Sequence, residues 1–361
     1  MDVGRLRQRP SLLLGVAALV LGAVAILLAG AALRTAGRAG EPAADRVTPR
    51  LRAGVELLAD PSEVVRAGGV HLLAGVLRDA PAEQPTVTSV LATFVRRQSQ
   101  ADAAAGDGVA TRRPAGAGQR RPGVDVQAAL TALGRRDAGR DRPGDPLDLT
   151  GAVLTGASLA QARLAGAVLT GVRLDHADLT GAELDRADLT GAFLRGAVLD
   201  RASLREARLG GADLTGARIN LAMLDRVTLA GAVLVGAELD GAGLTGATLV
   251  GAELRDARLD ATNLAAADLT GADLGGAYLG YVTAPGAELV RTRLVGANLV
   301  DIDLTDARLT GANLNGALLH GATLVGTEVT PEQISCAVLS DRTRLPAAMP
   351  RPGSPARTCA D

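Results

Sequence analysis

The sequence predicts an all-β solenoid, because one five-residue unit repeats over residues 147–330 and never changes phase. Leucine occupies the central position of almost every unit, and a small residue, most often alanine, stands two positions before it. Glycine is frequent two positions after the leucine. A fixed period over such a long stretch is typical of proteins that stack similar structural units.

The length of the unit decides between helix and strand. Five residues match neither the 3.6-residue period of an α-helix nor the two-residue period of a regular strand. Residues two positions apart, such as Ala177 and Leu179, can both face inward on a short extended piece. The next two residues, such as Thr180 and Gly181, then supply a corner, where glycine tolerates unusual backbone angles. Repetition of this step predicts a chain coiled around a core of leucine and alanine.

The unit resembles the pentapeptide-repeat family, whose motif is Ala-(Asp/Asn)-Leu-x-x. The resemblance covers about half of the chain and implies a right-handed, four-sided β-helix with four units in each coil. With about 20 residues in each coil, residues 147–330 would then form about nine coils. The family motif is complete at Ala177-Asp178-Leu179, Ala187-Asp188-Leu189, Ala212-Asp213-Leu214, Ala297-Asn298-Leu299 and Ala312-Asn313-Leu314.

The N-terminus predicts a membrane anchor. After a basic segment, residues 1–10, the stretch Ser11–Leu33 contains no charged residue. About 20 apolar residues cross a bilayer as a helix, and the apolar part of a signal peptide is usually shorter. We therefore expect a transmembrane helix over 11–33, with the membrane as one partner. The distribution of arginine mildly favours the C-terminal side as cytoplasmic. The predicted localisation is a single-pass membrane protein with a cytoplasmic repeat domain.

The segments that flank the repeats have different patterns. Helical periodicity predicts a small helical segment over 46–99, and a flexible linker follows over 100–146, with a short helix near 125–134 that could close the rod. Thr330 and Gln333 form the pattern of a capping box, which predicts a C-terminal capping helix over 331–345. We expect the tail, 346–361, to be disordered.

Two features suggest the source of the chain. The segment over 64–96 resembles the region before the repeats in membrane-anchored actinobacterial members of the family. All 38 basic residues are arginine, which suits a GC-rich coding bias.

The sequence predicts a protein that is not an enzyme. His71, His176 and His320 are far apart, and a chain without lysine cannot contain a Walker-type phosphate loop. Cys336 and Cys359 lack the spacing of metal ligands. They are interpreted as two unpaired thiols, with a disulfide as the alternative. We expect no catalytic, cofactor or metal site.

The preferred function is a membrane-tethered scaffold or protein-recognition rod, with an unidentified protein partner and no direct binding of nucleic acid. Its candidate interaction patch lies where the repeat is least regular, although a tolerated repeat defect would give the same pattern. The patch consists of Tyr278, Tyr281, Pro285, Val290, Val295 and Val300.

The first alternative function is mimicry of DNA. One branch of the family resembles a DNA duplex and binds or protects DNA gyrase, and residues 147–330 hold 22 acidic residues against 14 arginines. Arginine is interleaved on every side, however, and the loop of gyrase-protecting relatives is absent. A secreted or surface-exposed structural rod is the second alternative. The candidate acidic face consists of Asp178, Asp200, Glu238, Asp240, Asp260 and Asp301.

Overall fold

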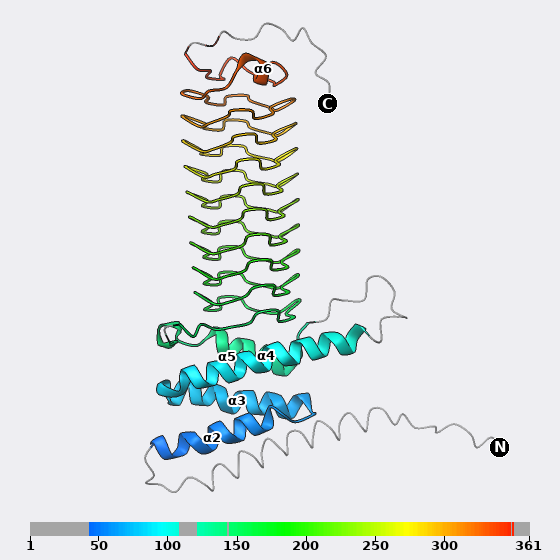
Figure 1. The fold of residues 1–361 in the computed structure, drawn as a ribbon, viewed down its shortest axis with the longest axis vertical. Helices are drawn as coiled ribbons and strands as arrows, with labels where there is room; N and C mark the ends of the chain where they lie inside the picture. Colours follow the sequence, from blue (N-terminus) through cyan, green and yellow to red (C-terminus); the bar gives the residue numbers. More distant parts are fainter. Residues whose placement is uncertain (1–42, 108–120, 143, 348, 350–361) are drawn as a thin grey trace, which may run out of the picture.

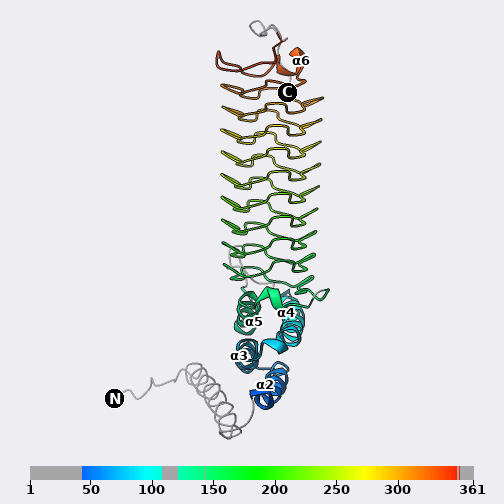
Figure 2. The ribbon, with the colours of Figure 1, turned by 90° about the vertical axis from the view of Figure 1, so that its left-hand side faces the viewer.

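The computed structural model describes residues 43–107, 121–142, 144–347 and 349, and these form a rod with helices at one end (Figure 1). The rod is a solenoid of stacked coils, and the two views at right angles show the same regular stacking (Figures 1 and 2). Helices α2, α3, α4 and α5 lie beneath the first coil, and the short helix α6 lies on the last one (Figure 1).

The register of the solenoid is one coil of four units. One residue in each unit pairs through a parallel bridge with the corresponding residue four units later, as Asp148 does with Val168. Residues five positions apart therefore lie on successive sides of the rod. We number the four sides from the first bridge residue on each, namely Asp148, Val153, Ser158 and Arg163.

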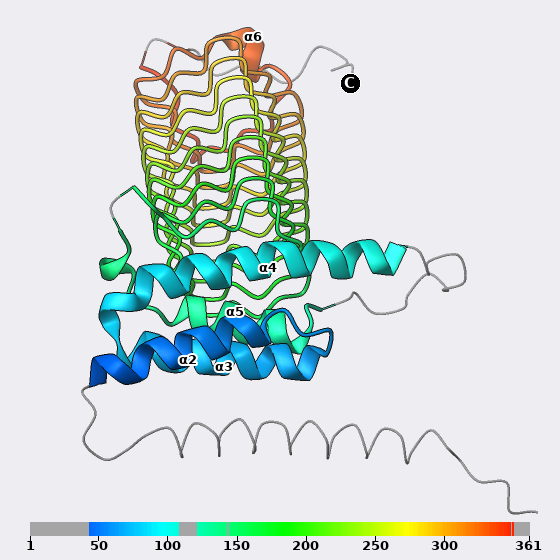
Figure 3. The same cartoon turned by 60° about the horizontal axis from the view of Figure 1, so that its bottom comes forward.

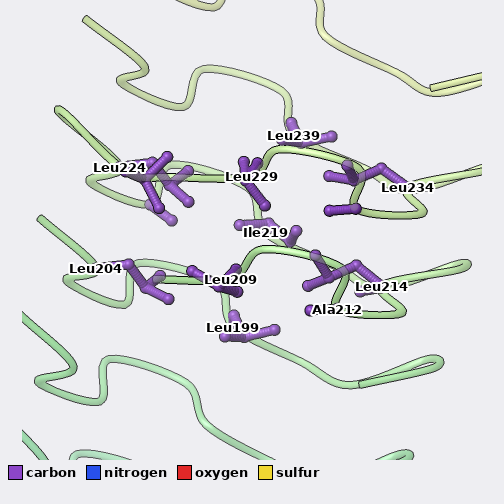
Figure 4. Close-up of a cluster of buried hydrophobic side chains, with 14 of the residues drawn as sticks. Leu199, Leu204, Leu209, Ala212, Leu214, Ile219, Leu224, Leu229, Leu234 and Leu239 are labelled. Atoms are coloured by element: carbon purple, nitrogen blue, oxygen red, sulfur yellow. The ribbon is translucent and has the colours of Figure 1, made fainter. Parts of the chain in front are cut away.

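The core is a continuous column of leucine and alanine. The central leucine of each unit and the small residue two positions before it are buried, for example Leu234 and Ala232, both 0% exposed. Leucines from successive sides point toward one another inside each coil and stack on those of the next coil (Figure 4). The inward assignment predicted from the sequence is confirmed. Each buried leucine contributes roughly 1.5–3 kcal/mol of transfer free energy.

Backbone hydrogen bonds use four of the five N–H groups in a regular unit. In the unit around Leu229, the N–H groups of Thr228, Leu229 and Gly231 donate to neighbouring coils. The N–H of Ala232 donates to the carbonyl of Leu229 and closes a turn. This turn has a positive φ only at its third residue, Gly231, which is the mark of a type II turn.

The fifth donor, the N–H of the residue after the leucine, lies outside the ladder. In many units an Asp or Asn immediately before the leucine accepts this N–H, as Asp213 does from Thr215 at 3.1 Å. Asp188 and Thr190 make the same bond at 3.0 Å, and the Thr190 hydroxyl adds a second one at 2.6 Å. This bond gives a physical reason for the Asp or Asn in the family motif, because it satisfies the one backbone donor that the coil leaves over.

The same bonds shift the titration of these carboxylates. The Thr190 hydroxyl, with its N–H and Arg208, lowers the pKa of Asp188 below its ordinary value, although partial burial raises it. Burial also raises the pKa of Asp213, but Thr215 and Arg195 together lower it further, so that the net shift is downward. Both carboxylates are therefore stabilised in their ionised form by the folded chain.

Four helices form a layer beneath the rod (Figure 3). Helix α2, Ala43–Leu57, packs on α3, Glu63–Asp79, at Gly54 and Gly69, where a Cβ on Gly69 would lie 2.8 Å from the carbonyl oxygen of Gly54. Arg66 of α3 pairs with the fully buried Asp125 of α5, Val124–Gly134, at 2.6 Å. Two short 3-10 helices lie in the connections: η1, Pro81–Glu83, between α3 and α4, and η3, Ala138–Arg140, between α5 and the first coil.

Helices α4 and α5 cover the first coil. Helix α4, Gln84–Asp107, extends into the stretch predicted as linker, and Gln100 donates to the carbonyl of Gly151 at 3.0 Å. On the opposite part of the coil, Gln127 of α5 exchanges two hydrogen bonds with the backbone of Ser158. The carbonyl at the end of α5, on Gly134, accepts the N–H of Arg163 at 2.9 Å. The helices thus supply partners for the backbone edge at the start of the rod.

The C-terminal end differs from its prediction. The capping box is confirmed, because Thr330 and Gln333 exchange both side-chain bonds, but α6 comprises only Pro331–Ile334. The prediction of a capping helix over 331–345 is therefore wrong. The chain instead returns to the ladder, where Val338 pairs with Leu318. Renewed pairing satisfies open backbone groups of the last coil, which a longer helix would leave without partners.

Two further predictions are corrected. Among the helices that the structure describes, none is long and apolar enough to cross a bilayer, and the predicted span Ser11–Leu33 lies outside the described residues. The localisation as a single-pass membrane protein with a cytoplasmic repeat domain is corrected accordingly. Cys336 is disulfide-bonded, so its interpretation as an unpaired thiol was wrong. The other cysteine of the chain, Cys359, and most of the tail lie outside the described residues.

The buried column of leucine predicts that neighbouring positions differ sharply in how much a charged substitution destabilises the rod. Leu234→Asp places a charge in the apolar core, whereas Val235→Asp adds one at a partly exposed turn. The first change should lower the free energy of unfolding by several kcal/mol and the second by less than about 0.5 kcal/mol. Equal urea midpoints for the two variants would contradict the described core.

The turns predict a reciprocal pair of substitutions. Gly231 has φ of 63°, and a Cβ there would meet no atom within 4 Å, so Gly231→Ala tests the backbone alone. Ala266 occupies the same turn position with φ of 55°. Gly231→Ala should destabilise the rod by about 1 kcal/mol, and Ala266→Gly should stabilise it by up to about the same amount. Thermal unfolding measures both, and a destabilised Ala266→Gly variant would refute the conformational reason.

The lowered pKa values predict a loss of stability in acid. Because the folded-state pKa of Asp188 and Asp213 is below the unfolded value of 3.8, their contribution is present above that value and is lost as the pH falls through the folded pKa. The melting temperature should therefore decline below about pH 5. Asp188→Asn with Asp213→Asn keeps an acceptor oxygen and should make the decline shallower. An unchanged pH dependence in the double variant would count against this origin.

Candidate recognition surface

The four-unit register divides the predicted interaction patch among all four sides. Tyr278, Tyr281 and Val300 lie on or at the corner of the third side. Pro285, Val290 and Val295 belong to the fourth, first and second sides, because each follows the previous one by one unit. The prediction that all six residues form one patch is therefore wrong. Only the first three remain together.

The third side nevertheless carries an apolar surface near the C-terminal end. Its bridge residues in successive coils are Tyr278, Asn298, Leu318 and Val338. Tyr278 is 47% exposed and Val338 is 43% exposed. Val300 lies beside Asn298, which accepts its N–H at 3.2 Å. We call Tyr278, Tyr281, Val300, Leu318 and Val338 the third-side patch.

The sequence pattern missed two members of this patch. Leu318 stands at an outward position of the repeat, two coils after Tyr278, and an assumed coil of four units would have placed the two on one side. Val338 could not be found in this way, because it follows α6, where the five-residue repeat has ended. Only the structure shows that it pairs with Leu318. A search for sequence irregularity finds neighbours along the chain, whereas the patch extends across coils.

Tyr281 occupies a strained position in the patch. Its φ is 58°, at a turn position that glycine usually fills, and its side chain is 67% exposed. Among the described residues with positive φ, the other large apolar side chain is Leu221, which is 55% exposed at the same corner three coils earlier. Strain in an exposed bulky residue gives no packing benefit to the core. Such strain is a reason to look for a functional role at Tyr281.

The ion pairs at the corner of the fourth side lie in the coils nearer the N-terminus. In the coils nearer the N-terminus, Glu206 pairs with Arg186 at 2.8 Å and with Arg226 at 2.6 Å along the corner of the fourth side. In the later coils the bridge residues of the fourth side are Thr283, Asp303 and Thr323, and the Asp303 carboxylate accepts the N–H of Thr305. On the third side, charged residues continue up to the tyrosines, because Tyr278 is bridged to Arg258 and Asp301, one coil after Tyr281, pairs with Arg342.

The predicted acidic face is largely a structural ladder. Asp200, Asn220, Asp240 and Asp260 stand one above another at the turn of the third side. Each accepts, through its side chain, the N–H of the next residue in the column, and the ladder ends at the N–H of Gly280. These bonds satisfy the same leftover donor that Asp213 satisfies in its own unit. Asp178 acts in that local way for Thr180.

Arginine neutralises much of what remains of this acidic face. Arg218 lies 2.5 Å from Asp200 and 3.8 Å from Glu238, and Arg258 lies 3.2 Å from Asp240 and 4.0 Å from Asp260. Arg342 pairs with Asp301 at 2.6 Å. A duplex presents regularly spaced phosphates without such compensation. The six carboxylates share one side, but they do not present an uninterrupted negative charge.

The chemistry of the rod is limited. Within the described residues, no group of three His, Cys, Asp or Glu side chains is placed to hold a metal ion. His176 is at a turn of the second side, where its ring lies over Gly196 of the next coil. The described surface of the rod therefore offers a partner its shape, its exposed apolar side chains and its paired charges.

Comparisons with known proteins agree with this architecture. A family profile described as pentapeptide repeats matches in eight copies, over residues 148–186, 182–220, 222–260, 257–294 and 287–326. No curated protein matches the chain.

Two solved structures illustrate the range of the similarity. HetL from the cyanobacterium Nostoc sp., described as involved in the regulation of heterocyst differentiation, is 34% identical with a TM-score of 0.51; the match covers 57% of this chain and 90% of HetL. A trypsin-treated form of QnrB1, a plasmid-mediated fluoroquinolone resistance protein, is 16% identical with a TM-score of 0.33, over 54% of this chain and 87% of QnrB1. The repeated unit, the four-unit coil, the profile match and the likeness to HetL together show that the chain belongs to the pentapeptide-repeat family, with the right-handed β-helix of that family.

Proposed function

We propose that this chain is a recognition rod without enzymatic activity, and that it binds a protein partner through the third-side patch. The observation that carries the proposal is the exposed, strained Tyr281 beside the exposed Tyr278 on one side of the rod. Aromatic side chains on a rigid surface contribute much contact area at a low cost in conformational entropy.

The construction of the rod supports this role. One residue in each unit is bridged to neighbouring coils, as Tyr278 and Leu318 are, so the backbone beneath the patch is held in one geometry before a partner arrives. Preorganisation of this kind reduces the entropic cost of association. The similarity to HetL, which is described as involved in regulation, fits a protein that acts through contacts with other proteins.

Mimicry of DNA is the alternative function. The excess of acidic residues over arginine in 147–330 favours it. The ion pairs of Arg218, Arg258 and Arg342 along the third side oppose it. A structural rod without a partner is the remaining possibility, and it would assign no role to the exposed tyrosines.

The proposal predicts that stability and binding respond in opposite directions to one substitution. Tyr281→Gly removes the ring and also relieves the positive φ, so the rod should become more stable by up to about 1 kcal/mol while partner binding falls. Leu221→Gly is the matched control, because it makes the same backbone change at the same corner three coils away. It should stabilise the rod and leave binding unchanged.

The measurement is affinity capture from extracts of the cells that produce the protein, with the bound proteins identified by mass spectrometry. A partner retained equally by the original chain and by the Tyr278→Ala and Tyr281→Gly variants would remove the proposed patch. In a parallel assay, we expect the purified rod to leave the supercoiling activity of DNA gyrase unchanged. Stoichiometric inhibition of gyrase would favour mimicry instead.

A further inference from the structure

The apolar residues along the third side are spaced by whole coils. Tyr278 and Leu318 are bridge residues of one column and lie two coils apart, with Asn298 between them. At about 4.8 Å for each coil, this distance is about 9.6 Å. Val338 follows Leu318 by one further coil, so the column from Tyr278 to Val338 is about 14 Å long. A peptide that lies along this column needs side chains at a matching distance.

This spacing distinguishes between the regular conformations of a peptide. A polyproline II helix completes one turn in three residues, or about 9.3 Å, which is close to the two coils between Tyr278 and Leu318. Residues on one face of a strand are about 6.7 Å apart, and one turn of an α-helix is about 5.4 Å. Neither distance matches one coil or two coils as closely.

The polar groups of the column suit the same conformation. A polyproline II helix has no internal hydrogen bonds, so its carbonyl groups need donors from outside. The side-chain oxygen of Asn298 accepts the N–H of Val300 at 3.2 Å, which leaves the NH2 group of Asn298 as a donor. The hydroxyl groups of the exposed Tyr278 and Tyr281 can donate as well. The patch thus offers donors to a chain that presents mainly acceptors.

The protein itself contains a segment of this kind. Residues 346–361 hold four prolines, and Pro352 and Pro355 form a P-x-x-P pattern. In a polyproline II helix, which has three residues in each turn, these two prolines would lie on one face, about 9.3 Å apart. Segments with this pattern are recognised by surfaces lined with aromatic side chains. The C-terminal tail therefore has the sequence and the period that the column fits.

Two attachments keep this tail near the patch. Met349 packs against the core, and the remaining residues of the chain follow it. Cys336, two residues before Val338, is disulfide-bonded. Within one chain its partner can only be Cys359, because the chain contains two cysteines. A segment attached in this way has an effective concentration in the millimolar range, so even a weak contact is occupied.

From these observations we infer that residues 350–361 dock on the third-side patch as a polyproline II segment. Pro352 would then contact Leu318, and Pro355 would contact the ring of Tyr278. The inference rests on the proposed function and adds its regulation, because the docked tail would cover the surface that a partner uses. A partner would therefore have to displace the tail before it binds.

The length of the tail permits this placement. Pro355 follows Met349 by six residues, which span about 19 Å in polyproline II, whereas the column is about 14 Å long. Cys359 follows Pro355 by four residues, which span up to about 13 Å, and a disulfide allows about 5.5 Å more between Cα atoms. The tail can thus reach Tyr278 while the disulfide to Cys336 is intact.

The test uses tyrosine fluorescence. The tyrosines of the patch are the two tyrosines of the whole chain, which contains no tryptophan, so their emission reports on the patch alone. Acrylamide quenching of the purified full-length chain measures how exposed they are. Removal of residues 350–361 should raise the quenching constant about twofold, because the attached tail is mostly docked. A synthetic peptide of residues 350–361, added to the shortened rod at millimolar concentration, should lower it again.

Single substitutions in the full-length chain test the assigned face of the tail. Pro355→Ala removes the contact with Tyr278 and should raise the quenching constant toward that of the shortened rod. Pro350→Ala is the matched control, because Pro350 lies off the face that Pro352 and Pro355 share, and it should leave the constant unchanged. Cys359→Ser keeps the P-x-x-P pattern but removes one attachment, so it should raise the constant less than the deletion does.

Several results would overturn the inference. One is a quenching constant that is the same with and without residues 350–361. Another is protection that depends on Cys359 but not on Pro355, because the disulfide and not the column would then hold the tail. Protection that is lost on dilution would assign the patch to the tail of a second copy, which contradicts docking within one chain.

Affinity capture separates this inference from the proposed function. Removal of residues 350–361 should increase the amount of partner that is retained. If the tail leaves the quenching unchanged while Tyr281→Gly still abolishes capture, the inference fails and the proposed function stands. If the tail protects the tyrosines but no partner depends on them, the proposed function fails and the docking of the tail stands.

Discussion

The bridge between a residue and its counterpart four units later determines every outward position of this protein. One such bridge in each unit fixes which side chains stand above one another, so residues distant in sequence become neighbours on a side. The leucine core enforces the same register from within, because a slip of one residue would exchange buried for exposed positions. Both the ladder of Asp200, Asn220, Asp240 and Asp260 and the third-side patch are consequences of this register.

The backbone donor left outside the ladder explains much of the polar sequence. An Asp or Asn can satisfy it from within the same unit, as Asp213 does, or from the coil before, as Asp200 does. When they are counted from the sequence alone, carboxylates that accept these backbone N–H groups look like an acidic recognition face. Their hydrogen bonds and their arginine partners show that a large part of the negative charge stabilises the rod itself.

The sequence predicted the regular part of the structure well, because one local rule with a fixed period determines it. The burial of leucine and alanine and the capping box at Thr330 followed from such rules. The short length of α6 did not, because renewed pairing of Val338 with Leu318 competes with helix formation, and that competition depends on contacts across coils. The distribution of the predicted patch over four sides likewise depends on three-dimensional placement.

The four-unit coil also decides how such a rod can change in length during evolution. Duplication of four consecutive units would add one complete coil and leave every side above it in the same direction relative to the helical layer. Duplication of a single unit would preserve the core equally well, but it would turn all later coils by a quarter of a revolution. Tyr278 and Tyr281 would then face another direction with respect to α4 and α5. Stability tolerates steps of one unit, whereas the alignment of two distant surfaces tolerates only steps of a whole coil.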